Sequence, residues 1–122
     1  MAFLIDSNII IYSYSNEYQY LRELVTDKLS SISEISRLEV LGYHKLKDDE
    51  RNYFDVVFSF VPVIFPSQEI YDRAIIVRRL HQLKLADSLI AATALVNGLS
   101  LCTRNVSDFE KVTGLKCVNP IK

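Results

Sequence analysis

The chain has 122 residues, of which 49% are hydrophobic and 24% are charged, a composition typical of a folded globular protein rather than a disordered one. No apolar run approaches the roughly 20 residues of a membrane-spanning helix, and the N-terminus lacks the features of a signal peptide. We therefore expect one cytoplasmic domain over residues 1–122. Only three glycines and three prolines are present, which favours helices and short connections over many tight hairpins.

The first apolar run, residues 2–5, ends at a carboxylate. Such a run is typical of a buried strand in a parallel sheet, and Asp6 would lie where that strand emerges. Residues 8–14 are expected to form a short helix and residues 17–30 an amphipathic helix, because leucine and valine recur there at helical spacing. Four tyrosines in this region suggest either a base-stacking or partner-binding surface or, more commonly, packing at the edge of a core: Tyr12, Tyr14, Tyr18 and Tyr20.

The next segment combines a short strand with two helices. Residues 31–35 are expected to form the strand, and Ser36 followed by Glu39 has the spacing of a capping box at a helix start. That capping role alone would explain Glu39. A second helix is expected over residues 48–60, after a mixed-charge segment that reads as a solvated turn and helix face.

Prolines mark the third strand, residues 61–66, as an edge strand because proline cannot donate a ladder hydrogen bond. Ser67 is the expected cap of the next helix. The face of this helix predicted to be buried comprises Ile70, Ala74, Val77 and Leu80 or His81. Its basic side, either solvated or in contact with RNA, comprises Arg73, Arg78 and Arg79.

Residues 85–97 are expected to form a helix with Asp87 in its first turn and Gly98 in the left-handed terminating position. Ser107 and Glu110 have the spacing of another capping box, which would place Asp108 in the first turn of a short helix. The two cysteines lack metal-type spacing and are expected to be buried thiols. Apolar segments alternating with helices indicate an α/β fold with a parallel sheet: residues 2–5, 31–35, 61–66, 99–103 and 115–118.

Four carboxylates follow from this layout as candidates for one site. Asp6 and Asp108 follow the first and fourth strands, Glu39 lies one helical turn past the second, and Asp87 opens the helix before the fourth. Each has a simple alternative role as a cap or solvated acid. Together they suggest a site for a hard cation such as Mg²⁺ or Mn²⁺, which prefers oxygen ligands. The net charge of −1 does not exclude a nucleic-acid substrate, because four acids set aside as metal ligands leave a positive remainder.

These segments resemble the four acidic motifs of the PIN-domain ribonucleases, and their order and spacing are most similar to the VapC toxins of toxin–antitoxin pairs. The motifs are LIDSN, ISRLE, LADSLIAA and TRNVSDF, at residues 4–8, 35–39, 85–92 and 103–109. The resemblance covers nearly the whole chain. It implies a parallel five-stranded sheet flanked by helices, Mg²⁺- or Mn²⁺-dependent endoribonuclease activity, a homodimer and a small cognate antitoxin.

By the same resemblance, the catalytic and metal-binding acids are Asp6, Glu39, Asp87 and Asp108. Asn8 and Thr103 fall at polar positions that support such a site. Ser7 replaces the threonine of many relatives but keeps the hydroxyl. Arg104 is a candidate contact to RNA phosphate, with a surface salt bridge as the alternative. The expected substrate is tRNA or another structured RNA cut at a single-stranded loop, whose splayed bases can enter a narrow cleft.

Two other interpretations stay open at this stage. One is a catalytically silent PIN-like module that binds RNA or protein, although the presence of all four acids argues against it. The other is a metal-dependent α/β phosphatase or phospho-acceptor domain. That class usually has a second aspartate near the first or a phosphate-binding lysine at a strand end, and neither is evident.

Overall fold

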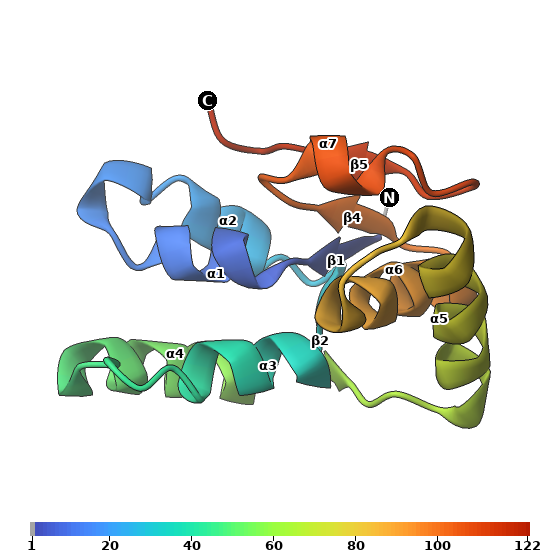
Figure 1. The fold of residues 1–122 in the computed structure, drawn as a ribbon. Coiled ribbons are helices and arrows are strands. Elements are labelled where there is room, and N and C mark those ends of the chain that lie inside the picture. Colours follow the sequence, from blue (N-terminus) through green and yellow to red (C-terminus); the bar gives the residue numbers. More distant parts are fainter. Residues whose placement is uncertain (1) are drawn as a thin grey trace.

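A computed structural model describes residues 2–122 as a five-stranded parallel sheet flanked by seven α-helices (Figure 1). The strands are β1 (Phe3–Ile5), β2 (Ser30–Ser33), β3 (Val63–Ile64), β4 (Ser100–Cys102) and β5 (Cys117–Val118). The helices are α1 (Ser7–Ser13), α2 (Leu21–Val25), α3 (Glu34–Leu41), α4 (Asp48–Phe60), α5 (Gln68–His81), α6 (Leu85–Asn97) and α7 (Val106–Phe109), with a 3₁₀ helix η1 (Asn16–Tyr18) after α1. The predicted α/β class is confirmed.

The sheet has the strand order β3-β2-β1-β4-β5, so the chain builds outward from β1 first in one direction and then in the other. The first strand therefore lies at the centre, with Leu4 paired to Ser31 on one side and Leu101 on the other. The order reverses between β1 and β4. In open α/β sheets, the crevice beyond the carboxyl ends of the strands at such a reversal is where ligands bind.

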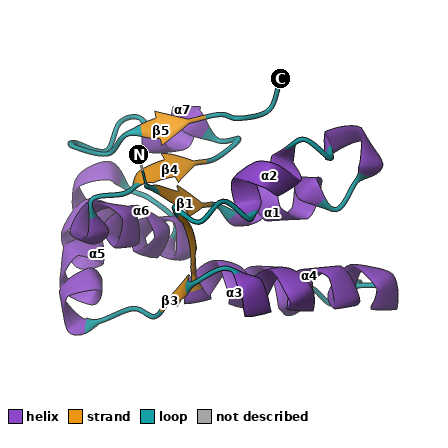
Figure 2. Cartoon of the chain, turned by 180° about the vertical axis from the view of Figure 1, so that it is seen from behind, coloured by secondary structure: helices purple, strands orange, loops and turns teal. Residues whose placement is uncertain are grey.

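Two layers of side chains cover the sheet because residues of a strand point alternately to opposite faces. Ile5 packs with α1, α2 and α4, whereas Leu4 packs with α6 and α7. Helix α6 approaches the sheet closely through small residues without exposed surface, namely Ala91, Ala92 and Ala94. Figures 1 and 2 show α3 and α4 side by side, extending from the sheet as an arm opposite α5. No helix within residues 2–122 is long and apolar enough to span a bilayer.

Several predicted elements are confirmed. Helix α4 has the predicted bounds, and Glu50 accepts the Lys47 N–H there (3.1 Å). Strand β3 is at the sheet edge, and Ser67 caps α5 by accepting the Ile70 N–H (3.2 Å). Gly98 ends α6 with φ = 64°. Neither cysteine forms a disulfide: Cys102 is buried and Cys117 partly so.

The predicted helix over residues 17–30 is wrong. The segment instead contains part of η1, the short α2 and a turn that leads into β2. After α2, the Thr26 hydroxyl donates back to the Arg22 carbonyl (2.7 Å), and the Asp27 carboxylate accepts the Leu29 N–H (2.8 Å). These local bonds compete with the helical pattern, as short polar side chains commonly do. Leu29 is consequently exposed rather than part of a buried helix face.

Both predicted capping boxes are also wrong. Helix α3 begins earlier than expected, with Ser33 as its cap accepting the Ile35 N–H (3.1 Å). Ser36 lies inside the helix, buried, and its hydroxyl has no hydrogen-bond partner among the described residues. Helix α7 is preceded by Asn105, not capped by Ser107. On α5, Ile70, Ala74 and Val77 are buried as predicted; of the two alternatives for the next position, Leu80 is 73% exposed and His81 is half-buried.

Candidate active site

The candidate site is organised around Asp6, at the junction between β1 and α1. Its backbone N–H donates to the Cys102 carbonyl of β4 (2.9 Å), and its extended backbone (φ −71°, ψ 155°) makes it the cap of α1. The residue is only 5% exposed. A strand that ends against its neighbour and turns at once into a helix thus fixes this carboxylate at the reversal of the sheet.

Four hydrogen bonds hold the Asp6 carboxylate in place. Oδ1 accepts the Ser7 N–H (2.8 Å) and, weakly, the Ser7 hydroxyl (3.5 Å). Oδ2 accepts the Thr103 hydroxyl (2.8 Å) and the Asn8 amide (3.2 Å). Burial raises the pKa of Asp6, while these donors act in the opposite direction by stabilising the anion. Such bonds orient the group without neutralising it.

Asn8 and Thr103 therefore lie where the sequence predicted polar support. The Thr103 hydroxyl links the two ends of the chain by donating to Asp6, and it also accepts the Asn105 N–H (3.0 Å). The Asn8 amide oxygen accepts the Arg104 N–H (3.1 Å) and so ties the β4–α7 loop to α1. Their positions agree with the predicted supporting role.

Glu39 reaches the same place from α3. The Ser7 hydroxyl donates to its Oε1 (3.2 Å), so Ser7 connects the carboxylates of Asp6 and Glu39. Partial burial raises the pKa of Glu39, the bond from Ser7 opposes this, and the charges of Asp6 and Asp87 raise the pKa further. Since α3 is capped by Ser33, capping does not explain this glutamate.

Asp87 and Asp108 complete the group from the first turns of α6 and α7. Partial burial raises the pKa of Asp87, as do the charges of Asp6 and Asp108, whereas the nearby Lys84 lowers it. Asp6, Glu39 and Asp87 thus act on one another electrostatically, and Asp108 joins the group through Asp87. Asp108 is exposed, as is Glu39, and its side chain forms no hydrogen bond within residues 2–122.

Ser7 was not among the residues predicted to form the site, and neither was Lys84. Ser7 had a sequence signal, a hydroxyl directly after the strand-terminal aspartate. Lys84 had one too, because it lies three residues before Asp87 and directly before α6, at the end of the turn between α5 and α6. That turn contains Gln82 in the left-handed conformation (φ 54°). Arg104 forms no salt bridge with the described residues; its guanidinium lies over the Tyr12 ring, 5.4 Å from the centroid.

The chemistry of this donor set fits a hard divalent cation. All four candidate ligands are carboxylates. Burial raises the pKa of Asp6, Glu39 and Asp87, and the charges of neighbouring acids raise the pKa of Glu39 and Asp87 further, so a bound cation would relieve both effects. Within residues 2–122, no three His, Cys, Asp or Glu side chains are close enough together to share one ion. Binding would therefore need rotamer changes, which Glu39 and Asp108 can make because they lie on helix surfaces.

This combination of a sheet reversal, a buried aspartate and three further acids from α3, α6 and α7 agrees with the family comparison. The model of the PIN domain family matches residues 3–115, and the chain belongs to that family. Ribonuclease VapC1 of Rickettsia felis is 38% identical over 68 residues, which span 52% of this chain and 49% of that protein. The match thus covers about half the length of this curated relative.

Solved structures extend the similarity to the whole chain. A toxin–antitoxin complex from Klebsiella pneumoniae contains a chain with 31% identity and a TM-score of 0.83, with 99% of both chains covered. The VapBC2 complex of Rickettsia felis, bound to a DNA fragment from its promoter, matches at 22% identity with a TM-score of 0.81 over 98% of both chains. At that lower identity the likeness concerns the fold.

Proposed function

We propose that this chain is a divalent-metal-dependent endoribonuclease and the toxin of a VapBC-type toxin–antitoxin pair, acting in the cytoplasm. The observation that carries the proposal is the Asp6 carboxylate, buried at the sheet reversal, held by three neighbours and faced by three further acids. The 38% identity with Ribonuclease VapC1 and the 31% identity with a chain of a toxin–antitoxin complex support it.

In this proposal the acids bind cations and the surrounding polar groups orient the acids. Asp6, Glu39, Asp87 and Asp108 are the residues that would hold Mg²⁺ or Mn²⁺. When bound, such a cation supplies activation of water and stabilisation of the leaving oxygen in phosphodiester hydrolysis. The contribution of the chain itself is preorganisation of Asp6: Thr103, Asn8 and Ser7 hold its carboxylate in one rotamer, so this group does not have to be ordered when substrate arrives.

The decisive experiment is cleavage of RNA by the purified chain with Mg²⁺, with Mn²⁺ and with a chelator. Structured RNAs such as tRNA should be cut within a single-stranded loop, and the chelator should abolish cutting. Asp6→Asn should reduce the cleavage rate by orders of magnitude because the amide cannot supply the charge that holds a cation. A folded Asp6→Asn protein that cuts RNA at the wild-type rate would refute the proposal.

The alternative, a silent module that binds RNA or protein, makes the opposite prediction. It allows RNA binding but no cleavage with any divalent ion. The buried, hydrogen-bonded state of Asp6 favours the enzyme, since a binding module gains nothing from a desolvated anion whose pKa is raised.

We further propose that a small antitoxin blocks the site by inserting an arginine among the acids. A guanidinium pairs with carboxylates through two parallel hydrogen bonds and keeps its charge when buried, so it can replace a cation. Co-expression with the product of an adjacent small reading frame should abolish cleavage. A complex that leaves the acids open and the nuclease active would contradict this mode of inhibition.

We also propose a homodimer formed through α5 and α6. A groove of about 490 Å³ lies between these helices, and large apolar side chains are exposed beside it, including Tyr71, Ile75 and Leu85. Clustered exposed apolar side chains commonly mark an interface. Ile75→Glu should convert a dimer into a monomer in sedimentation experiments, whereas Val56→Glu, an equally exposed position on α4, should not.

A further inference from the structure

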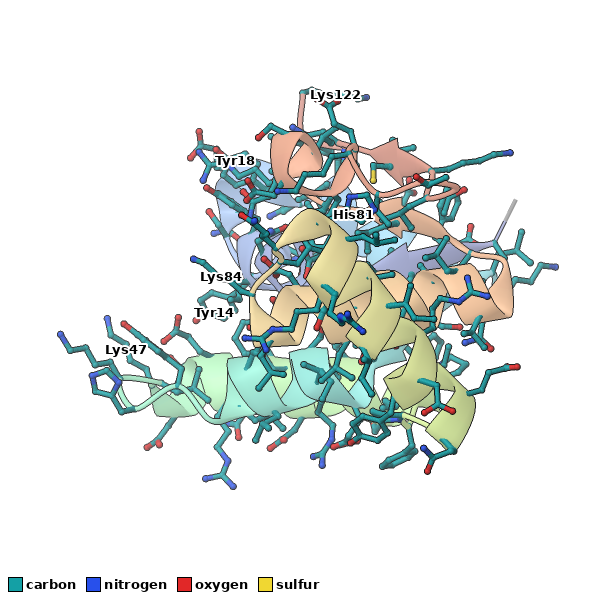
Figure 3. The ribbon with its side chains drawn as sticks, turned by 45° about the vertical axis from the view of Figure 1, so that its right-hand side comes forward. Tyr14, Tyr18, Lys47, His81, Lys84 and Lys122 are labelled. Atoms are coloured by element: carbon teal, nitrogen blue, oxygen red, sulfur yellow. The ribbon has the colours of Figure 1, made fainter. Side chains whose placement is uncertain are left out.

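Three of the four N-terminal tyrosines form a continuous row, which we call the tyrosine row: Tyr12, Tyr18 and Tyr20. The ring centroids of Tyr12 and Tyr18 are 4.9 Å apart at 77°, and those of Tyr18 and Tyr20 are 6.3 Å apart at 60°. Tyr14 is not part of it, because its ring packs against Tyr53 and Phe54 of α4. Figure 3 shows this division, with Tyr18 near the upper side of the view and Tyr14 lower, nearer α4.

A cation lies at each end of the tyrosine row. The Arg104 guanidinium is 5.4 Å from the Tyr12 centroid, and the Lys122 ammonium is 5.6 Å from the Tyr20 centroid. The Tyr20 hydroxyl also accepts the Lys122 N–H (3.0 Å). Neither cation forms a salt bridge with an acid of the described residues. Both therefore keep their charge available for an anion outside the chain.

The tyrosine row begins where the acidic site ends. Asn8 and Tyr12 are four residues apart on α1, so they lie on one face of the helix. Asn8 donates to Asp6 and accepts the N–H of Arg104, the residue directly after Thr103. One short hydrogen-bonded path thus connects the buried carboxylate to the first tyrosine and its cation.

We propose that single-stranded RNA entering or leaving the acidic site lies along the tyrosine row. Its bases stack on the tyrosine rings, and its phosphates pair with Arg104 and Lys122. Aromatic rings beside cations are the usual platform for single-stranded nucleic acid, because every base has a stacking face. Tyr20 is 38% exposed and offers the most accessible ring, whereas Tyr12 and Tyr18 are half-buried and also hold the row in shape. This proposal rests on the proposed ribonuclease function and extends it to the path of the substrate.

The test measures RNA binding in an Asp87→Asn background, so that bound RNA stays uncut in Mg²⁺. Fluorescence anisotropy follows single-stranded RNA of about 4 and about 16 nucleotides, the range over which such sites vary. Tyr20→Ala should weaken binding of the longer RNA about tenfold, while Tyr20→Phe, which keeps the ring, should bind like the parent. Tyr43→Ala is the matched control, because Tyr43 is also exposed but lies beyond α3, beside His44.

The contribution of the Arg104 charge to RNA binding is tested separately. Arg104→Gln should weaken binding of the longer RNA and lower the slope of log affinity against log salt by about one, the signature of one lost phosphate contact. Arg51→Gln, which removes an exposed arginine of α4, should leave the slope unchanged. Binding of the short RNA should respond much less to Tyr20→Ala, because it is held mainly at the acids.

If the wild type cuts RNA and the Asp87→Asn parent binds it, but Tyr20→Ala and Arg104→Gln bind the longer RNA as tightly as the parent, the substrate path is wrong and the ribonuclease stands. If these variants lose only the binding of a protein inhibitor, the tyrosine row is a protein-binding surface and the proposal is overturned. A wild type that does not cut RNA, together with a parent that does not bind it, overturns both. Melting curves identify any variant that fails to fold. In that case the difference in RNA affinity between Tyr20→Phe and Tyr20→Ala decides whether RNA lies along the tyrosine row.

Discussion

Replacing Asp87 by asparagine separates a metal ligand from an ordinary helix-start acid. In the metal-free protein two effects oppose each other. The loss of an anion in the first turn of α6 costs about 0.3–1 kcal/mol. Relief of repulsion from Asp6 and Asp108 returns a similar amount, since partly exposed charge pairs contribute about 0.2–1 kcal/mol each. The metal-free variant should therefore lie within about 1 kcal/mol of the wild type.

Added Mg²⁺ should separate the two proteins. A cation that binds only the folded state at about 100 times its Kd stabilises by about 2.7 kcal/mol. If Asp87→Asn weakens binding about tenfold, as even the loss of a group that supports a metal ligand can do, the gain falls to about 1.4 kcal/mol. For a chain of this length 1 kcal/mol shifts Tm by about 4 °C. The expected rises in Tm are thus about 11 °C for the wild type and about 6 °C for the variant.

Glu69→Gln provides the matched control in the same thermal-melting assay. Glu69 is also an acid in the first turn of a helix, α5, but it is exposed and is not among the acids whose charges act on one another at the site. Its replacement should lower Tm slightly and leave the response to Mg²⁺ unchanged. Equal Mg²⁺-induced shifts for the wild type and Asp87→Asn would refute the assignment of Asp87 as a ligand.

Three further outcomes are expected. Thr103→Val should destabilise the fold by about 1–3 kcal/mol in denaturant titrations, because the buried Asp6 carboxylate loses its shortest side-chain donor; an unchanged midpoint would contradict that role. Ser7→Ala should cost only about 0.5–1.5 kcal/mol but weaken Mn²⁺ binding in calorimetry, since the hydroxyl joins Asp6 to Glu39; unaltered affinity would argue against the bridge. The folded state raises the pKa of Asp6, Glu39 and Asp87, so above about pH 4 it binds more protons than the unfolded chain. The free energy of unfolding in chelator should therefore fall as pH rises through these raised pKa values. Saturating Mg²⁺ should flatten this pH dependence.

The parts of the fold predicted from sequence are those where local and tertiary preferences agree. Helix α4 has the predicted bounds because its acidic start, its apolar spacing and the proline after it all indicate the same helix. Helix α6 ends at Gly98 because this residue adopts the left-handed conformation at little cost. The strands were located by apolar runs, although only two to four residues of each form ladders.

The two wrong predictions of helix starts have the same cause. Ser36 and Ser107 have the spacing of capping boxes, but β2 ends at Ser33 and the β4–α7 loop is tied to Asn8, so both helices begin one or more residues early. At both helix starts the tertiary contacts therefore outweigh the local capping signal. Glu39 and Asp87 lie on helices and were assigned through the family resemblance. The positions of Asp6 and Asp108, which follow β1 and β4, were predictable because the carboxyl ends of parallel strands meet at one edge of a sheet. The bridge made by Ser7 was not, since it depends on the distance between two helices.

The hydrogen bond from Thr103 to Asp6 has a consequence for the time at which the site forms. Its partners are 97 residues apart in the chain, and the strands that carry them, β1 and β4, are neighbours only in the finished sheet. During synthesis at about 5–20 residues per second, Asp6 is made roughly 5–20 s before its partner. Through that interval the nascent chain has an N-terminal strand without one of its two neighbours and a carboxylate without its shortest side-chain donor. The constellation of acids is therefore assembled late, when the last sixth of the chain reaches the sheet.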